Sequence, residues 1–327
     1  MRKSKWVDWV WDSWCILSLI GIWPRFIEPR LLSTTCLTLP IAQLPIDLAG
    51  LTILQFSDLH WNSNFPPSLA RKLVKKINSL KPDLIVFTGD FLCRSTLQSP
   101  LELQTFLSSL KAKVGCYAVL GNHDYESYVT AGEEGDYDIE QFKKANPLTK
   151  GLKRFFFSPP LSGKVSLAAR QVGMHSELIH LLQKTPFQLI HNETKIISYK
   201  GSRINLCGLG EHTLARCLPQ EAFKNYHTKF PGIVLTHNPD ALPELLKFPG
   251  DLVLAGHTHG AQINLPLIWD KLTRIEQMEL IRGVRKIGHK WVYINRGIGG
   301  TIPFRWFSIP ELTMITLKRG EAGHDSI

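Results

Sequence analysis

Five short apolar runs stand out along the chain, and a polar segment follows each of them directly. The runs are rich in β-branched residues and almost free of polar side chains, and they cover 51–56, 82–87, 116–120, 232–235 and 251–255. Such runs are typical of strands that are buried on both faces of a sheet. We therefore predict an α/β fold, a sandwich of two mixed β-sheets flanked by helices.

The polar segments carry the residues of chemical interest. They are Ser57–His60, Thr88–Asp90, Gly121–Asp124, Thr236–Asn238 and Gly256–His259. In sheets of this kind the reactive groups gather in the loops beyond the carboxyl ends of the strands. Taken singly, a segment could be an ordinary turn or a surface metal clip. Five of them in order, each after a predicted strand, favour convergence at one edge of the fold.

The side chains in these segments are carboxylates, imidazoles and one amide, without a thiolate. This set suits Mn, Fe, Co, Ni or Zn, and does not suit a cysteine-based zinc site. Two divalent ions about 3.5–4 Å apart can promote an in-line displacement at phosphorus. Only a carboxylate has two oxygens to share between two ions, and we expect Asp90 to be that bridge.

The order of the five motifs resembles the calcineurin-like metallophosphoesterases, whose pattern is D-x-H, G-D, G-N-H-D/E, H and G-H-x-H. The resemblance implies that His123 is a catalytic histidine that binds no metal, steadied by its neighbour Asp124. It favours Mn. It also implies a complete ligand set: Asp58, His60 and His259 for the first metal, Asn122, His237 and His257 for the second, and Asp90 between them.

Further segments narrow the resemblance to the bacterial membrane-associated branch of that family. They include 236–240, 251–262 and 295–311. Ala261 and the pair Glu211–His212 depart from the branch pattern, but neither touches an implied ligand. With its N-terminus and insertion, the chain is similar to the UDP-2,3-diacylglucosamine pyrophosphatases of lipid A synthesis, particularly the chlamydial type. That similarity implies hydrolysis of UDP-2,3-diacylglucosamine to UMP and 2,3-diacylglucosamine 1-phosphate.

Other functions remain open at this point. A general membrane-associated phosphodiesterase or a nuclease of the same fold would use the same metals. A non-catalytic membrane scaffold would be expected to have lost ligands or His123, and here the implied set is complete. A structural lipid-binding protein would be expected to bind lipid tightly whether or not metals are chelated. For substrate contacts we nominate Arg94, just beyond Asp90, and Arg296, because a guanidinium binds phosphate oxygens in pairs.

The N-terminal segment favours a membrane surface. Residues 6–23 read WVDWVWDSWCILSLIGIW, with basic residues on both sides, and tryptophan prefers the interface between water and lipid. The stretch is short for a span of about 20 residues and contains Asp8 and Asp12. We expect a helix within 1–30 that lies in the interface, with crossing, a cleaved signal peptide and packing on the protein itself as alternatives.

Charge and cysteine content agree with that location. The net charge of +10 calls for an anionic partner, and with this N-terminus we expect a membrane surface and an acylated nucleotide sugar rather than nucleic acid. The six cysteines show no paired spacing, so we expect reduced, buried thiols. The predicted place is the cytoplasmic side of the inner membrane, peripheral or N-terminally anchored.

The rest of the chain divides into three further parts, and the second of them contains an insertion. Residues 31–50 are predicted to be a proline-stiffened linker, 51–318 the catalytic domain and 319–327 a tail. Within the domain, 125–184 carries no motif of the family and is too long for a bare loop, so we expect a partly helical lid over the metals. Leu178–Leu182 fits a helix face, and Phe155–Phe157 beside basic residues could bind a lipid substrate.

Overall fold

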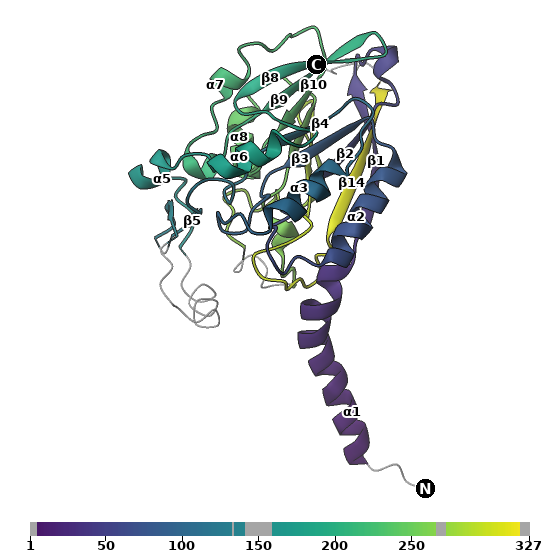
Figure 1. Ribbon diagram of the computed structural model, residues 1–327, viewed down its shortest axis with the longest axis vertical. Coiled ribbons are helices and arrows are strands. Elements are labelled where there is room, and N and C mark those ends of the chain that lie inside the picture. The colour runs from purple at the N-terminus through teal and green to yellow at the C-terminus, as the bar shows by residue number, and fades with distance from the viewer. Residues whose placement is uncertain (1–4, 133, 141–158, 266–272, 321–327) are drawn as a thin grey trace.

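The computed structural model describes residues 5–132, 134–140, 159–265 and 273–320, and Figure 1 shows two packed sheets with helices outside them. The first sheet runs β1-β14-β2-β3-β4-β7 and the second β12-β13-β11-β10-β9-β8. The predicted class of fold is therefore confirmed. The strands of the first sheet are β1 (Ser33–Ala42), β14 (Glu311–Gly320), β2 (Thr52–Phe56), β3 (Leu84–Thr88), β4 (Gly115–Val119) and β7 (Phe187–Leu189). Those of the second are β12 (Gly283–Ile287), β13 (Lys290–Ile294), β11 (Leu252–Ala255), β10 (Gly232–Leu235), β9 (Ser202–Gly208) and β8 (Glu193–Tyr199).

The strands that carry the motifs lie in the middle of both sheets. In the first sheet β2, β3, β4 and β7 are parallel, with β14 antiparallel to β2. In the second sheet β9, β10, β11 and β13 are parallel, while the edge strands β8 and β12 are antiparallel to their neighbours. All five predicted strands are present. Their carboxyl ends therefore meet at one end of the sandwich.

Successive side chains of each strand point to opposite faces of its sheet, and this divides the core into three layers. Between the sheets, Ile53 and Val86 of the first sheet pack in one cluster with Leu206 and Leu254 of the second. The opposite faces are covered by helices. The outer face of the first sheet packs against α2 (Pro67–Leu80), α3 (Pro100–Ser108) and α6 (Ser176–Leu182), and that of the second against α7 (Pro219–Ala222) and α8 (Leu242–Leu245).

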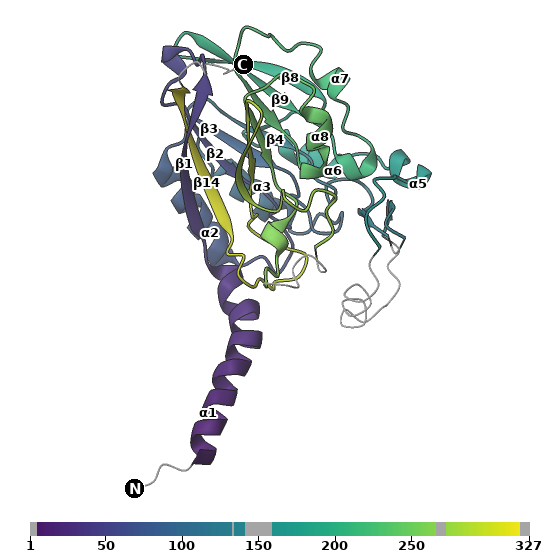
Figure 2. The ribbon, with the colours of Figure 1, turned by 180° about the vertical axis from the view of Figure 1, so that it is seen from behind.

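A helix at the N-terminus projects away from the body of the protein (Figures 1 and 2). It consists of α1 (Lys5–Leu17), a π-helical continuation (Ser18–Ile27) and a 3-10 turn (Glu28–Arg30). A helix is therefore present where one was predicted, and its place in a membrane interface stays a prediction. Among the described residues, no helix combines the length and apolarity that a membrane span needs. The large apolar side chains exposed along it are those of Trp6, Trp9, Val10, Trp11, Trp14, Ile16, Leu17, Leu19, Ile20, Ile22, Trp23, Phe26 and Ile27.

The predicted linker is wrong for most of its length. Residues 33–42 form β1, which pairs in parallel with all ten residues of β14. The segment is rich in Thr, Leu and Ile, which favour strands, and it forms an edge strand, where Pro40 is tolerated. The predicted tail also begins too early, because β14 continues to Gly320, and 321–327 lie outside the described residues.

The cysteine prediction is correct only in part. All six cysteines are free. Cys116 and Cys207 are buried, but Cys15 and Cys36 are exposed, because they lie on the projecting helix and on the edge strand β1. The expectation that all six thiols are buried is therefore wrong.

The insertion at 125–184 contains a hairpin and two short helices. The hairpin pairs β5 (Val129–Ala131) with β6 (Tyr137–Ile139), and α5 (Leu167–Gln171) precedes α6. The predicted helix face is present, since Leu178, Leu181 and Leu182 of α6 are buried. Residues 141–158, with the three phenylalanines, lie outside the described part of the chain. Single-turn 3-10 helices elsewhere cover Ile46–Leu48, His212–Leu214, Pro239–Ala241 and His259–Ala261.

Candidate metal centre

All the implied ligands sit in the loops that directly follow the central strands. Asp58 and His60 follow β2, Asp90 follows β3, and the loops after β4, β10 and β11 supply the others. The left-handed backbone recurs in these loops, with φ of 52° at Asp58, 46° at His60 and 65° at Asp90. Non-glycine residues adopt this conformation in only a few per cent of cases, and it costs backbone energy. The strands thus bring the five motifs together, and strained backbone aims their side chains.

Two glycines allow the carboxylates to lie against neighbouring backbone. A Cβ atom at Gly121 would lie 2.2 Å from Oδ1 of Asp90, and one at Gly256 would lie 2.7 Å from Oδ2 of Asp58. Any larger residue would push these carboxylates out of place. The glycines in the G-N-H-D and G-H-x-H motifs therefore make room for ligands that come from other loops.

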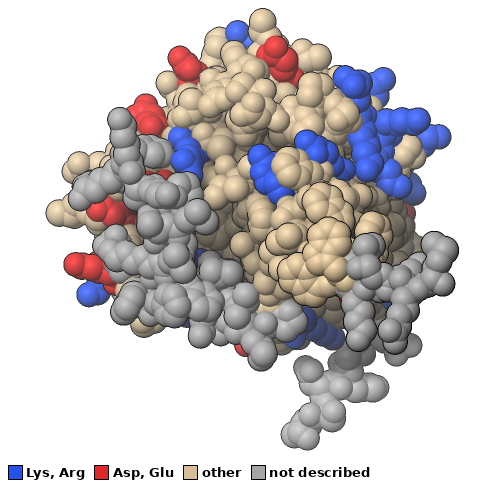
Figure 3. All heavy atoms as spheres, turned by 90° about the horizontal axis from the view of Figure 1, so that it is seen from below, with Lys and Arg blue, Asp and Glu red and all other residues tan. Residues whose placement is uncertain are grey.

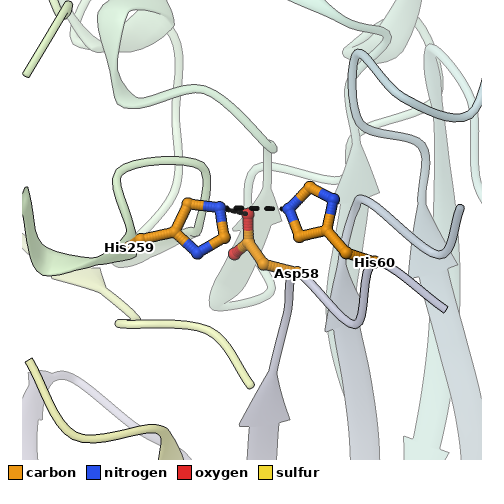
Figure 4. Close-up of side chains that lie close together, drawn as sticks. All are labelled: Asp58, His60 and His259. Atoms are coloured by element: carbon orange, nitrogen blue, oxygen red, sulfur yellow. Dashed lines mark hydrogen bonds and ion pairs between the residues drawn. The ribbon is translucent and has the colours of Figure 1, made fainter. Parts of the chain in front are cut away.

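The first group of ligands comes from β2 and β11. Asp58, His60 and His259 point toward one another (Figure 4). Nε2 of His60 lies 3.0 Å from Nε2 of His259, and Oδ1 of Asp58 lies 3.5 Å from the latter nitrogen. Asp58 is fully buried and His60 is 1% exposed. One imidazole from each side and a carboxylate between them can hold one cation.

The second group consists of Asp90, His237 and His257, from the loops after β3, β10 and β11. Asp90 also contacts His60 of the first group. Oδ2 of Asp90 lies 3.3 Å from Nε2 of His237 and 3.5 Å from Nε2 of His60. Nδ1 of His257 lies 3.1 Å from Nε2 of His237. The Asp90 carboxylate therefore lies between the two groups, where a bridging ligand belongs. His60 is the neighbour from the first group, and His237 and His257 complete the second.

The hydrogen-bond partners of these side chains indicate whether the residues fit metal ions. Nδ2 of Asn122 donates to the carbonyl of Val129 at 2.8 Å, while its buried Oδ1 has no hydrogen-bond partner. Nδ1 of His237 donates to the carbonyl of Thr88 at 2.7 Å, so Nε2 is the ring nitrogen that faces Asp90. Buried polar atoms seldom lack partners in folded proteins. The orphan amide oxygen and the facing imidazole nitrogens fit divalent cations, without selecting one metal.

Burial dominates the electrostatics of the centre. It raises the pKa of Asp58 to about 7, and it lowers the pKa of His60 to about 4 and that of His257 to about 3. Burial opposes the charged form of His237 too, yet the Asp90 carboxylate raises its pKa well above the ordinary value. Most of the imidazoles are thus held neutral, which is the form that binds metal.

His123 lies beside Asp90 but is held by a different contact. Its Nδ1 accepts a hydrogen bond of 2.8 Å from the backbone N–H of Arg94, and its Nε2 lies 3.8 Å from Oδ2 of Asp90. The ring stacks on Tyr128, with centroids 4.0 Å apart. Tyr128 precedes β5, so the hairpin of the insertion does reach the metal centre. Residues of the hairpin also line the hollow around His60, Asp90 and His123.

The contact expected of Asp124 is corrected by the structure. Its carboxylate does not bond to the His123 ring; it accepts hydrogen bonds from the backbone N–H groups of Asp90, Leu92 and Gly121 at 2.8, 2.9 and 3.0 Å. These bonds tie the loop after β3 to the loop after β4. Asp124 thus holds the backbone around Asp90, and Arg94 holds His123.

The two arginines nominated for phosphate are placed differently. Arg94 is exposed and lines a cavity next to His60. The guanidinium of Arg296 pairs with Glu311 at 3.1 Å and donates to Oγ of Ser33 at 3.0 Å, so its charge is already compensated inside the protein. Its role in substrate binding remains a prediction without support from its contacts. That of Arg94 remains a prediction that its position allows.

Sequence reasoning did not assign a role to Arg305. It is 2% exposed, and its guanidinium donates to the carbonyls of Arg296, Gly299 and Ser308 and lies 3.2 Å from Nδ1 of His259. Burial lowers its pKa to about 10. Arg305 therefore braces the loop 296–308 against His259, one of the implied ligands. Only its presence in the C-terminal segment of the branch pattern could have drawn attention to it.

Comparisons with known proteins agree with the geometry. The family model for calcineurin-like phosphoesterases matches residues 51–261. The UDP-2,3-diacylglucosamine pyrophosphatases LpxG of Chlamydia muridarum and Chlamydia trachomatis serovar D are each 38% identical to this chain over 91% of its length and 92% of theirs. Phosphodiesterase YaeI of Escherichia coli is 26% identical over 82% of this chain and 83% of its own. The chain belongs to the calcineurin-like phosphoesterase family and is a hydrolase.

Proposed function

We propose that this protein hydrolyses UDP-2,3-diacylglucosamine to UMP and 2,3-diacylglucosamine 1-phosphate, a step of lipid A synthesis. The observation that carries the proposal is the 38% identity to two chlamydial pyrophosphatases of that name over nine-tenths of the chain. The candidate metal centre supports it, because the chain has every residue of the ligand set that the family resemblance implies, and three groups of them lie close enough to hold metal ions. A scaffold with no catalytic role would have no need for the complete set.

The residues divide the chemistry between them. Asp58, His60 and His259 would hold one ion, Asn122, His237 and His257 the other, and Asp90 would lie between the two, with Mn as our proposed metal. When bound, two divalent ions activate water and neutralise the charge that develops on the phosphoryl oxygens.

His123 has a separate task. Its Nδ1 is an acceptor from Arg94, and burial lowers its pKa well below the ordinary value, so the ring is neutral with its proton on Nε2. That N–H faces the space beside Asp90, where it can donate a hydrogen bond to a phosphoryl or leaving oxygen. Asp124 and Gly121 keep the two loops at the distance this contact needs.

We further propose that the protein works on the cytoplasmic face of the inner membrane, held by its N-terminal helix. The helix exposes four tryptophans between Trp6 and Trp14, each at least 56% exposed. Seen from the end at which it projects, Lys and Arg gather on one side of the molecule (Figure 3). Basic side chains near such a helix favour anionic lipid surfaces.

The test uses purified full-length protein loaded with Mn. It is incubated with UDP-2,3-diacylglucosamine in detergent and, separately, with bis-p-nitrophenyl phosphate, each beside a His123→Ala variant. Release of UMP and the acylated sugar phosphate, lost in the variant, is the expected result. Turnover of the soluble diester alone would keep the phosphoesterase and overturn the lipid substrate, in favour of a general phosphodiesterase.

A further inference from the structure

A cavity of about 650 Å³ extends from the candidate metal centre to the base of the N-terminal helix. His60 lines one end of it, and Arg25, Pro29 and Arg30 line the other. The cavity adjoins the smaller hollow of the metal centre, because His60 and Thr301 line both. Its volume is within the usual range for sites that bind small molecules. Nothing in the family's metal motifs accounts for it.

The wall of the cavity is apolar in one part and basic in another. Among its apolar lining residues, Ile302 and Pro303 are exposed and Phe304 is half-buried, while Leu59, Phe65, Leu69 and Ile298 are buried. Three exposed arginines stand around it: Arg25, Arg30 and Arg94. Apolar side chains can pack against an acyl chain or the apolar face of a sugar, and guanidinium groups bind phosphate oxygens. The combination suits an amphiphile with an anionic head, and neither a plain hydrocarbon nor a free nucleotide matches both parts.

The helix end of the cavity is bordered by exposed apolar side chains. Trp23 and Phe26 are exposed on the helix, 37% and 49%, and Ile302 is 49% exposed on the loop opposite. The two elements touch, because Nη1 of Arg25 donates to the carbonyl of Pro303 at 3.3 Å. An apolar surface of this kind marks a lipid or protein contact. Tails lying along the helix could therefore enter the cavity without crossing water.

Buried contacts fix the base of the helix to the same loop. The carboxylate of Glu28 is 1% exposed, accepts from the backbone N–H of Ser308 at 2.5 Å and accepts from Nε1 of Trp23 at 2.8 Å. The backbone N–H of Arg305 donates to the carbonyl of Pro24 at 2.8 Å. The wall of the cavity is thus preformed, which lowers the cost of binding.

Building on the proposed function, we propose that this cavity binds the lipid end of the substrate. The phosphoryl group lies at the His60 end, the sugar against the apolar lining, and the acyl chains leave between the helix base and Ile302 toward the membrane. The nucleotide then falls on the opposite side, toward the hairpin β5–β6. The acyl chains then lie at the base of the helix and not in the insertion, where the sequence had led us to expect lipid binding.

A native thiol reports on occupancy without any turnover. Cys93 lines the cavity and is half-buried, whereas Cys217 is half-buried and does not line it. Full-length protein is kept in digitonin micelles, because this detergent is too bulky for the cavity. It is alkylated with N-ethylmaleimide at mildly alkaline pH, since burial raises the pKa of both thiols. Modification of each cysteine is followed by mass spectrometry, with dodecyl phosphate as the probe.

Dodecyl phosphate at ten times its dissociation constant is expected to slow the modification of Cys93 about tenfold. Cys217 should be unaffected. Methyl phosphate, which has the head and lacks the tail, should need a far higher concentration. Protection of both cysteines alike, equal protection by methyl phosphate, or no protection at all would overturn the proposal.

Matched substitutions test the same cavity in turnover. Asn64 is an exposed residue on its wall, and Ser68 is exposed nearby and does not line it. Asn64→Trp should reduce kcat/KM for UDP-2,3-diacylglucosamine about tenfold more than kcat/KM for bis-p-nitrophenyl phosphate, equivalent to about 1.4 kcal/mol. Ser68→Trp should leave both values at the wild-type level. Equal effects of Asn64→Trp on the two substrates would contradict the assignment.

The two experiments separate this inference from the function on which it rests. If dodecyl phosphate protects Cys93 while UDP-2,3-diacylglucosamine is not hydrolysed, the lipid cavity stands and the proposed substrate is wrong. If the nucleotide lipid is hydrolysed while Cys93 stays unprotected and Asn64→Trp has no selective effect, the substrate stands and the cavity is wrong.

Discussion

His123 accepts a hydrogen bond of 2.8 Å at Nδ1 from the backbone N–H of Arg94. Because a backbone N–H can only donate, this contact fixes the neutral tautomer that carries its proton on Nε2. The proton faces Asp90 and the ligands around it. The ring is thereby prepared to donate a hydrogen bond, and the loop after β3 positions both the Asp90 carboxylate and the His123 ring.

Replacing His123 by Ala is expected to lower kcat by about 10²- to 10⁴-fold, the range for loss of a positioned proton donor. Because His123 is not in the implied ligand set, the variant should keep the metal content of the wild type. The rate with bis-p-nitrophenyl phosphate and the metal content by mass spectrometry decide the matter. Loss of bound metal in the variant would indicate that His123 is itself a metal ligand. An unchanged rate would show that His123 takes no part in the reaction.

Replacing Asp90 by Ala should have the opposite signature, loss of bound metal together with turnover. Its Oδ2 lies within 3.8 Å of Nε2 of His60, His123 and His237, so without it the imidazoles lose the negative charge that balances two cations. Asp47→Ala, at an exposed carboxylate in the turn Ile46–Leu48, is the matched control. We expect this control to keep both metals, and a metal-replete Asp90→Ala protein would exclude a bridging role.

Most of the metal centre could be predicted because its information is local. Each ligand follows a short apolar strand, as His237 follows β10, and parallel strands bring such loops together whatever the rest of the fold does. Contacts that depend on distant parts of the chain could not be predicted. The Glu28 carboxylate meets Ser308 across 280 residues, and no pattern around either residue points to the other.

The linker was mispredicted for a related reason. Pro29, Pro40 and Pro45 suggested stiff coil, but the partner of residues 33–42 is β14, at the other end of the chain. Pairing with a long neighbouring strand can hold an edge strand in place even when its own sequence shows little strand pattern, and proline is tolerated at a sheet edge, as at Pro40. The contact of Asp124 was mispredicted in the same way. It is next to His123 in sequence, yet its carboxylate accepts hydrogen bonds from the backbone N–H groups of Asp90 and Leu92.

Deleting residues 1–22 should release the protein from membranes and keep cleavage of the soluble diester. The deletion stops before Trp23 because Nε1 of Trp23 donates to Glu28, and Pro24 is buried. Flotation with vesicles containing anionic lipid measures the association. Substituting Trp6, Trp9, Trp11 and Trp14 by Ser in the full chain is the companion variant. Undiminished flotation of both would place the membrane contact elsewhere in the molecule.

Asp83 gives a stability prediction away from the metal centre. Its Oδ2 accepts from the backbone N–H and from the hydroxyl of Thr52 at 2.9 and 2.7 Å, joining the start of β3 to the start of β2, and Lys113 lies 2.9 Å from Oδ1. Burial opposes ionisation, but the hydrogen bonds from Thr52 and Lys113 outweigh it and lower the pKa of Asp83 below 3.8. The ionised carboxylate thus stabilises the folded state.

Asp83→Asn should therefore lower the free energy of unfolding at pH 7 by about 1–3 kcal/mol, the cost of weakening hydrogen bonds to a buried charge. The ion pair adds little, because the Lys113 side chain is 61% exposed. Since the pKa is lowered on folding, the stabilisation is present above the ordinary pKa of 3.8 and is lost as pH falls through the lower, folded value. Urea unfolding of metal-free wild type and variant at pH 7 and at lower pH, with Asp47→Asn as the exposed control, should show a gap that narrows only in acid. A gap independent of pH would mean that the charge of Asp83 contributes nothing.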